Sequence, residues 1–307
     1  MDVMSPASAR YLQGAVCGLA AASIWASQSA VTRFAVTTSF DPWDVALLRY
    51  GLAGVLLLPV LARRGLALDR LGWPGLAAIV AGAGAPYVLI AAAALRLAPA
   101  AELSALNPGC IPLFVVALAF LFVRETVAAA QTAGLALIAA GAVLLIASNA
   151  TEAHLSWDTS RLFGAALALS AALMWAVFTL VMRRAELDPL HAAALVSTGS
   201  LAIYLPVYVA WRGTILTQVP LVELTIQVGF QGVLVAVVSL LLYGRAIAML
   251  GASGGAAFGS LVPPLAALIA IPLLGEWPSA TDWLAIALIS AGVYLASGGP
   301  LALRRMG

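Results

Sequence analysis

Residues 107–112 read Asn-Pro-Gly-Cys-Ile-Pro, residues 261–264 read Leu-Val-Pro-Pro, and each run opens an apolar segment that ends in a glutamate. The two copies keep the same spacing, from Pro112 to Glu125 and from Pro263 to Glu276. Because proline removes a backbone hydrogen bond and kinks a helix, we predict that both segments are interrupted helices. Membranes tolerate such interruptions where they face protein or a watery cavity, and paired interruptions in two halves of a chain indicate a transporter.

The composition places the chain in a lipid bilayer. Of the 307 residues, 63% are hydrophobic and only 9% are charged, whereas a soluble domain carries about 25% charged residues. The basic residues are all arginine, and a net charge of +2 gives no indication of a nucleic-acid partner. Cys17 and Cys110 both lie in apolar segments and form neither a disulfide framework nor a metal-binding spacing, so we expect no metal and no cofactor.

Ten apolar segments are long enough to cross roughly 30 Å of hydrocarbon as helices. They cover approximately residues 11–32, 43–62, 73–95, 99–123, 127–148, 162–182, 189–211, 222–249, 253–274 and 280–299. The longest connection, from Asn149 to Arg161, divides the chain into two five-span repeats, residues 1–150 and 151–307. The predicted fold class is therefore an all-α integral membrane protein.

The two halves repeat each other in order. The second half carries Trp175 where the first carries Trp25, and the same register relates Arg33 to Arg183. Gly141 and Gly292 follow the two proline-to-glutamate stretches, each in the same register relative to its own stretch. An odd number of spans per repeat turns the second repeat upside down relative to the first, as in many secondary transporters. We therefore predict ten transmembrane helices in two inverted repeats around a central cavity.

Arginine sets the expected orientation, because cytoplasmic loops carry an excess of positive charge. With a cytoplasmic N-terminus, the cytoplasmic ends of the spans hold Arg10, Arg63, Arg64, Arg70, Arg124, Arg183, Arg184, Arg304 and Arg305. The outer ends then hold only Arg33, Arg96, Arg161 and Arg212. Both termini are expected on the cytoplasmic side.

Ten spans in two inverted halves, with the repeated proline-to-glutamate stretches, resemble the drug/metabolite transporter superfamily, and its EamA-type repeat is the most similar. Leu48-Arg49-Tyr50 in the second span also looks like that family's arginine motif, while the second half has Ser197-Thr198 near that position. Within the superfamily the chain is most similar to the YddG-type amino-acid exporters of bacterial inner membranes. The resemblance implies a ten-helix basket whose cavity is lined mainly by spans one, three, four, six, eight and nine.

Polar and aromatic side chains recur at helical spacing in the first and sixth spans. One face of the first span carries Trp25, Gln28, Ser29 and Thr32, and the sixth repeats these spacings with Trp175, Phe178, Thr179 and Met182. Because the two stripes occupy symmetry-related places, we predict that they line the cavity and face each other across it. The alternative is that these side chains hold neighbouring helices together by hydrogen bonds.

Four other places provide candidate substrate-binding residues. They are Tyr87 beside a proline in the third span, Asn107 before the first proline run, Gln231 and Ser239 in the eighth span, and Tyr243 one turn further on. Gln231 and Ser239 are a little over two turns apart, so we expect them to share a helix face. Here too the alternative is an internal hydrogen bond without a functional role.

Charged residues inside the spans require partners. Arg49 lies about two turns from the outer end of the second span, and we expect it to pair with Asp44 or Asp41 or to cap carbonyl groups. The alternative is that Arg49 meets a substrate carboxylate. Glu125 and Glu276 are expected to be structural.

Small multidrug exporters of the same superfamily carry a carboxylate in the middle of the first span, where this chain has Trp25 and Gln28. A neutral, aromatic cavity suits an uncharged or zwitterionic solute. We therefore predict a transporter, not an enzyme, that exports small neutral or zwitterionic metabolites by alternating access. Amino acids, aromatic and apolar ones included, are the expected cargo, and that solute and the bilayer are the expected partners. A monomer is compatible with the sequence.

Two alternatives remain open at this point. One is a transporter of another metabolite or drug, although a nucleotide sugar would require several cavity arginines. The other is an intramembrane serine protease that uses Ser253 in the run Gly-Ala-Ser-Gly at 251–254, with His191 as the available base.

Overall fold

The protein is described by a computed structural model that covers residues 6–123, 128–151, 158–212 and 219–298. Within these residues the chain is helical throughout, apart from short connections, which confirms the predicted all-α fold. The helices are α1 (Pro6–Thr38), α2 (Pro42–Arg64), α3 (Leu68–Ala83), α4 (Ala85–Leu97), α5 (Ala100–Val123), α6 (Ala129–Thr151), α7 (Thr159–Arg184), α8 (Pro189–Arg212), α9 (Leu221–Gln227), α10 (Ser239–Ala257), α11 (Val262–Leu274) and α12 (Ala280–Ala296). A π-helix, η2 (Val228–Val238), joins α9 to α10, and a 3₁₀ turn, η3 (Phe258–Leu261), joins α10 to α11.

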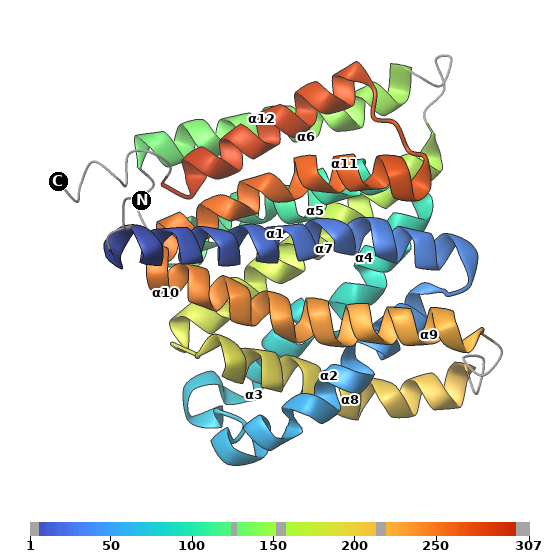
Figure 1. Cartoon of the computed structure of the whole chain (residues 1–307), viewed down its shortest axis with the longest axis vertical. Helices are drawn as coiled ribbons and strands as arrows, with labels where there is room; N and C mark the ends of the chain where they lie inside the picture. Colours follow the sequence, from blue (N-terminus) through green and yellow to red (C-terminus); the bar gives the residue numbers. More distant parts are fainter. Residues whose placement is uncertain (1–5, 124–127, 152–157, 213–218, 299–307) are drawn as a thin grey trace, which may run out of the picture.

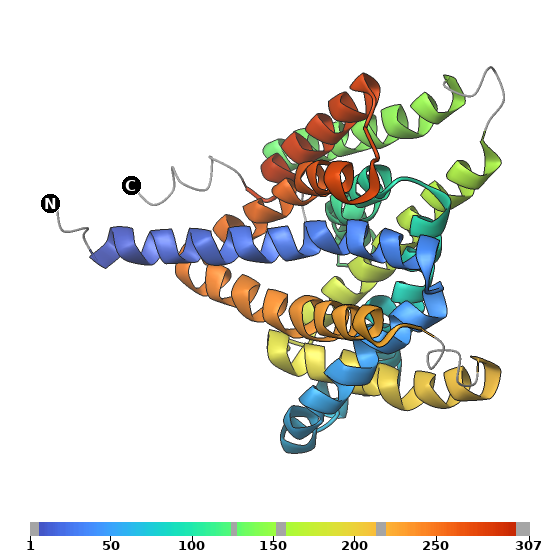
Figure 2. The ribbon, with the colours of Figure 1, turned by 45° about the vertical axis from the view of Figure 1, so that its right-hand side comes forward.

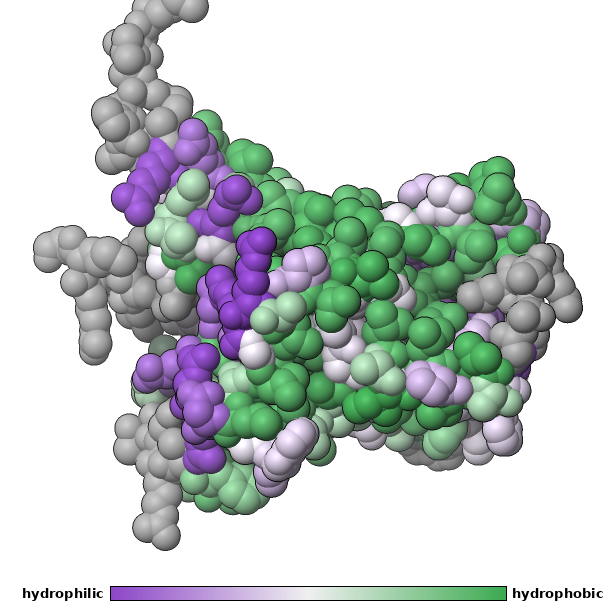
Figure 3. Space-filling model, turned by 90° about the horizontal axis from the view of Figure 1, so that it is seen from below, coloured by the Kyte–Doolittle hydropathy of each residue, from purple (hydrophilic) through white to green (hydrophobic). Residues whose placement is uncertain are grey.

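Nine helical segments of the described chain are long and apolar enough to cross a membrane, and α3 together with α4 counts as one of them. The tenth expected span is the shorter apolar helix α12, which has 17 residues and so spans about 25 Å. Figure 3 shows a broad hydrophobic band across the molecule, with hydrophilic side chains gathered at the end where Figure 1 places both termini. This distribution is that of a multi-pass membrane protein.

Helix packing follows the symmetry of the two repeats. The fifth spans of the two halves pair as α6 with α12, and the second spans pair as α2 with α8. The first span α1 packs against α10 and α11, and its counterpart α7 packs in the corresponding way against α3, α4 and α5. Figures 1 and 2 show the α6–α12 pair at one edge of the molecule, with α2, α3 and α8 at the opposite edge.

Small residues allow the α6–α12 pair to approach backbone to backbone. A Cβ atom on Gly292 would lie 2.6 Å from the Gly134 carbonyl oxygen, and one on Gly141 would lie 2.8 Å from the Ala285 carbonyl oxygen. Such contacts between small residues are typical of membrane helices, which gain little from burying apolar side chains out of lipid. The recurrence of Gly141 and Gly292 in the sequence therefore marks a helix contact.

The helix interruptions differ from the sequence prediction. The prediction of a break at the first proline run is wrong, since α5 stays helical through Pro108 and Pro112. In the first half the interruption lies instead in the third span, where Gly84 adopts an extended conformation between α3 and α4. The second half keeps its predicted interruption as the 3₁₀ turn before Pro263. A proline alone does not fix the place of a break, because neighbouring helices can stabilise a continuous helix around it.

Candidate functional site

A buried arginine lies in the middle of the bundle. Arg49 of α2 is 6% exposed, and its Nε and Nη2 donate to the Gln231 side-chain oxygen at 3.2 and 2.6 Å. With the Gln28 amide turned so that its oxygen faces the guanidinium, Gln28 accepts from Nη1 at 3.2 Å and from Nη2 at 2.9 Å. The Gln231 nitrogen donates in turn to the Thr32 hydroxyl at 3.0 Å. We call Gln28, Thr32, Arg49 and Gln231 the guanidinium cluster.

The expected ion pair between Arg49 and a nearby aspartate is wrong. Asp44 accepts a hydrogen bond from the Tyr208 hydroxyl at 2.6 Å and caps the start of α2, while Asp41 pairs with Arg212. None of the ion pairs among the described residues includes Arg49. Two neutral amide oxygens therefore accept hydrogen bonds from all three guanidinium nitrogens, while no carboxylate of the described residues offsets the charge.

The π-helix η2 brings Gln231 to this position. Its wider turn, closed by i to i+5 hydrogen bonds, is rare and occurs frequently at functional sites. Gln231 and Ser239, at the end of η2, are both fully buried and both contact α1, through Thr32 and Trp25 respectively. This confirms that they share a helix face.

A second group of predicted residues surrounds Trp25. The Trp25 indole nitrogen donates to the Ser239 hydroxyl at 2.9 Å, and its ring meets the Tyr243 ring edge to face at a centroid distance of 5.0 Å. Ser239 itself donates to the Val235 carbonyl oxygen. Trp25 is thus held against α10.

A third group lies between α4, α5 and α7. The rings of Tyr87 and Trp175 lie 5.0 Å apart, and Phe178 meets Trp175 at 5.3 Å. The Asn107 amide nitrogen donates to the Tyr87 hydroxyl at 3.2 Å, but the Asn107 side-chain oxygen is buried without a partner. An unpaired buried acceptor is costly, so this oxygen is suited to a donor supplied from elsewhere.

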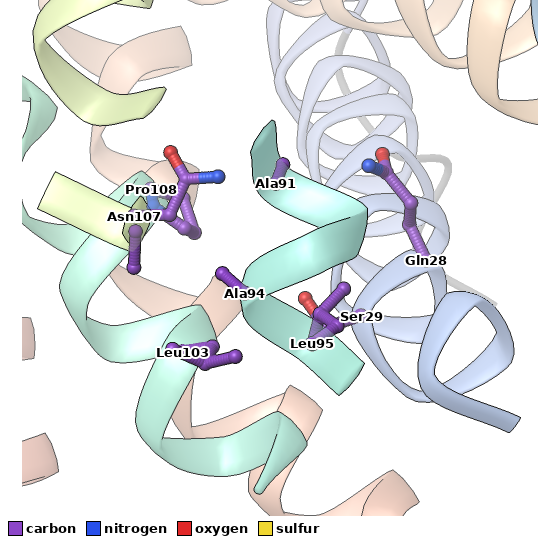
Figure 4. A pocket seen from close by; sticks show the side chains of 9 residues that line it. Gln28, Ser29, Ala91, Ala94, Leu95, Leu103, Asn107 and Pro108 are labelled. Atoms are coloured by element: carbon purple, nitrogen blue, oxygen red, sulfur yellow. The ribbon is translucent and has the colours of Figure 1, made fainter. Parts of the chain in front are cut away.

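Two small adjoining cavities connect the guanidinium cluster with Asn107 of the third group. The first, about 20 Å³, is lined by Gln28 and Ser29 of α1, Ala91, Ala94 and Leu95 of α4, Leu103, Asn107 and Pro108 of α5, and Ala168 of α7. The second, about 10 Å³, is lined by Gln28, Thr32, Arg49, Val88, Ala91, Ala92 and Leu95. Figure 4 shows the Gln28 and Asn107 amides on either side of Ala91 in α4. Each cavity has room for about one water molecule, so the site is closed in this structure.

The structure therefore brings the predicted residues into three neighbouring groups rather than two facing stripes. Trp25 packs on Tyr243, whereas Trp175 packs on Tyr87. Thr179 hydrogen-bonds the carbonyl oxygen of Trp175 within its own helix, and Ser29 lines the first cavity.

Sequence reasoning undervalued Arg49 and missed a clamp at the end of the bundle where α1 ends. Arg33 pairs there with Glu276, and its Nη1 donates to the carbonyl oxygens of Leu95 and Ala98 at 2.6 and 2.7 Å. The other Glu276 oxygen accepts from the Ala100 amide at 2.8 Å. This Arg33–Glu276 clamp ties α1 and the α11–α12 connection to the junction of α4 and α5. The sequence did carry a signal for this clamp, because Arg33 and Glu276 each have a counterpart in the other repeat, namely Arg183 and Glu125.

The base required by the protease alternative is His191, and the structure gives this side chain another partner. His191 is buried at the start of α8, where its Nε2 lies 2.9 Å from the Gly65 carbonyl oxygen. The side chain of Ser253 and the residue Glu125 lie outside the described part of the chain. No group of three or more potential metal ligands occurs among the described residues.

Comparisons with known proteins agree with this architecture. The model of the EamA-like transporter family matches residues 12–147 and again residues 162–298. A search of curated proteins found no significant match. Among similar solved structures is a crystal structure titled only as that of a protein, with 21% sequence identity and a TM-score of 0.63 over 95% of this chain and 98% of that one. That likeness shows the fold.

Proposed function

The chain belongs to the EamA-like transporter family and is a multi-pass membrane transporter of the drug/metabolite transporter superfamily, not an enzyme; we propose that it exports small zwitterionic metabolites, chiefly neutral amino acids. Aromatic and medium-sized apolar amino acids are the best candidates. The proposed location is a bacterial inner membrane, with both termini cytoplasmic, and the proposed working unit is a single chain.

The observation that carries this proposal is the composition of the site. The two cavities are lined by neutral amides and one guanidinium, the Asn107 oxygen there lacks a donor, and the Asn107 nitrogen donates to the hydroxyl of Tyr87 in the neighbouring aromatic group. An apolar or aromatic side chain fits beside Tyr87 and Trp175, while an ammonium group matches the Asn107 oxygen and the faces of the rings. A neutral amino acid combines these features in one small molecule.

The position of the acidic residues argues against a lipophilic cation as cargo. Within the described chain, every acidic residue lies in a connection or in the first turn of a helix, as Asp44, Glu102, Glu223 and Asp282 do. A cation held in the middle of the membrane would need a carboxylate nearby. A nucleotide sugar is disfavoured for the opposite reason, because Arg49 alone faces the cavities with a positive charge.

Alternating access follows from the closed site and the clamp. An amino acid is much larger than either cavity, so the helices around the site must separate to admit it. We propose that the Arg33–Glu276 clamp closes the outer end of the path, and that the two repeats, residues 1–150 and 151–307, move against each other. The corresponding charges in the sequence repeat are Arg183 and Glu125, and we expect them to act at the inner end.

The test is counterflow in proteoliposomes of the purified full chain. Vesicles loaded with unlabelled phenylalanine, at equal pH on both sides, should accumulate labelled phenylalanine, because exchange needs neither a proton gradient nor an acidic relay. Leucine should compete, while a nucleotide sugar and a quaternary ammonium drug should not. Absence of exchange, together with uptake of a lipophilic cation when a pH gradient is imposed, would refute the proposed cargo and mechanism.

A further inference from the structure

We propose that Arg49 is the carboxylate-binding residue of this site, and that the Gln28 amide oxygen occupies the carboxylate position in the closed, unloaded protein. The inference rests on the proposed function and deepens it, because it names the chemical group that a substrate must carry. It departs from the sequence-based expectation that Arg49 is structural.

The first argument is the state of the guanidinium charge. Taking an arginine out of water into a protein interior in the bilayer is costly, and a counter-ion normally offsets that cost. The arginines Arg33, Arg64, Arg161 and Arg212 all have carboxylate partners at the ends of helices. Arg49 is more deeply buried, pairs with no carboxylate among the described residues, and donates to the neutral amide oxygens of Gln231 and Gln28. An anion at this position would supply the missing negative charge.

The second argument is access. Arg49 lines a cavity rather than a sealed helix contact, and that cavity shares Gln28, Ala91 and Leu95 with the one that reaches Asn107. A ligand anchored at Arg49 therefore extends toward the unpaired Asn107 oxygen and toward the adjoining rings. The two adjoining cavities thus offer an anion-binding group and an unpaired acceptor, the two kinds of partner that a zwitterion requires.

The third argument is the difference between the two glutamines. Gln231 is fully buried and its nitrogen is held by Thr32, so its oxygen is a fixed partner of Arg49. Gln28, by contrast, is half-buried and lines both cavities. A carboxylate offers two oxygens in the plane that a guanidinium recognises, and the charge makes these bonds stronger than those to an amide. A carboxylate can therefore replace the Gln28 oxygen, while Gln231 continues to orient Arg49.

The test compares phenyl-bearing ligands that carry different polar groups, with phenylacetate and phenylacetamide as the matched pair that differs in charge at nearly the same shape. In detergent, the thermal stability of the full chain would be measured with phenylalanine, phenylacetate, phenylacetamide and phenethylamine. Phenylalanine and phenylacetate should stabilise the wild type, with apparent affinities at least tenfold better than that of phenylacetamide. Phenethylamine, which lacks a carboxylate, should have little effect.

Variants assign the effect to the residue. Arg49→Gln should abolish the preference for phenylacetate over phenylacetamide, and Arg49→Lys should retain part of it, because lysine keeps the charge but loses the paired donors. The matched control is Arg64→Gln on the same helix, where the arginine is exposed and pairs with Asp188. That control should bind like the wild type.

Three outcomes separate this inference from the proposed function. If phenylacetamide stabilises the wild type as well as phenylacetate does, the inference is overturned whether or not the variants fold. If Arg49→Gln folds and still prefers the carboxylate, the inference is also overturned, even where phenylalanine is exchanged normally. If phenylacetate binds through Arg49 but phenylalanine shows no counterflow, the assignment of Arg49 as the carboxylate-binding residue is supported and the proposed amino-acid transport is refuted.

Discussion

The Arg33–Glu276 clamp gives the most direct test of how the protein opens. Glu276 is 19% exposed and bridges the Arg33 guanidinium and the Ala100 amide, so both of its oxygens are engaged in the closed state. In an open state these groups would separate and be hydrated. Glu276→Gln keeps the size and one acceptor oxygen but removes the charge, so it should weaken the closed state selectively.

The expected size follows from the bonds that change. A hydrogen bond to a charged group contributes about 1.5–3 kcal/mol and one between neutral groups about 0.5–1.5 kcal/mol. The substitution converts charge-assisted bonds into neutral ones, and partial exposure reduces the loss, so we expect about 1–2 kcal/mol in total. Since about 1.4 kcal/mol corresponds to tenfold, the open population should rise between about 5-fold and 30-fold.

The assay is the rate of thiol modification from outside the membrane. Ser29, which lines the first cavity, would be replaced by cysteine in a background of Cys17→Ala and Cys110→Ala. A membrane-impermeant thiol reagent applied to right-side-out vesicles should then modify Cys at position 29 faster when Glu276→Gln is present, in proportion to the open population. Asp188→Asn, which breaks the exposed pair with Arg64 at the opposite end, should leave the rate unchanged.

An unchanged rate in Glu276→Gln would refute the assignment of the clamp to closure. An equal acceleration in Asp188→Asn would do the same, since it would indicate general loosening of the fold.

Four other predictions address packing, site and topology. Gly292→Ala should lower the melting temperature in detergent, because its Cβ would lie 2.6 Å from the Gly134 carbonyl oxygen. We expect the free energy of unfolding to fall by about 1–3 kcal/mol. Gly244→Ala should leave the melting temperature unchanged, because the space around Gly244 is open. Trp175→Ala should reduce counterflow tenfold or more without loss of folded protein. As a control, Trp211→Ala should leave counterflow intact, because the Trp211 side chain is 78% exposed. Normal transport by Trp175→Ala would mean that Trp175 serves packing only. Ser239→Ala should destabilise the protein by about 1–3 kcal/mol in thermal unfolding, since the partly buried Trp25 indole loses its acceptor. Ser239→Thr should restore most of the loss. Reporter fusions at Gly307 should be active on the cytoplasmic side, and a periplasmic C-terminus would contradict the orientation given by the arginines.

Hydrophobicity and repetition in the sequence were sufficient to predict the membrane class, the helical spans and the two-repeat plan. These features are local or depend on one-dimensional spacing, because a bilayer of fixed thickness requires a continuous apolar helix of fixed length. The repeat likewise showed that Gly141 and Gly292 occupy equivalent places. It also identified most of the aromatic and amide side chains that the structure gathers in the middle of the bundle.

The partners of those side chains were decided only by the tertiary structure. Helical spacing tells which residues share a face, but it does not tell which helix that face meets. Arg49 was therefore assigned to Asp44 or Asp41 nearby, whereas it bonds to Gln231, 182 positions away in the chain. The π-helix that places Gln231 and the break at Gly84 are also products of packing, because neighbouring helices must compensate the altered backbone bonds. The sequence thus determined what kind of protein this is, while long-range packing decided which charge faces the cavities.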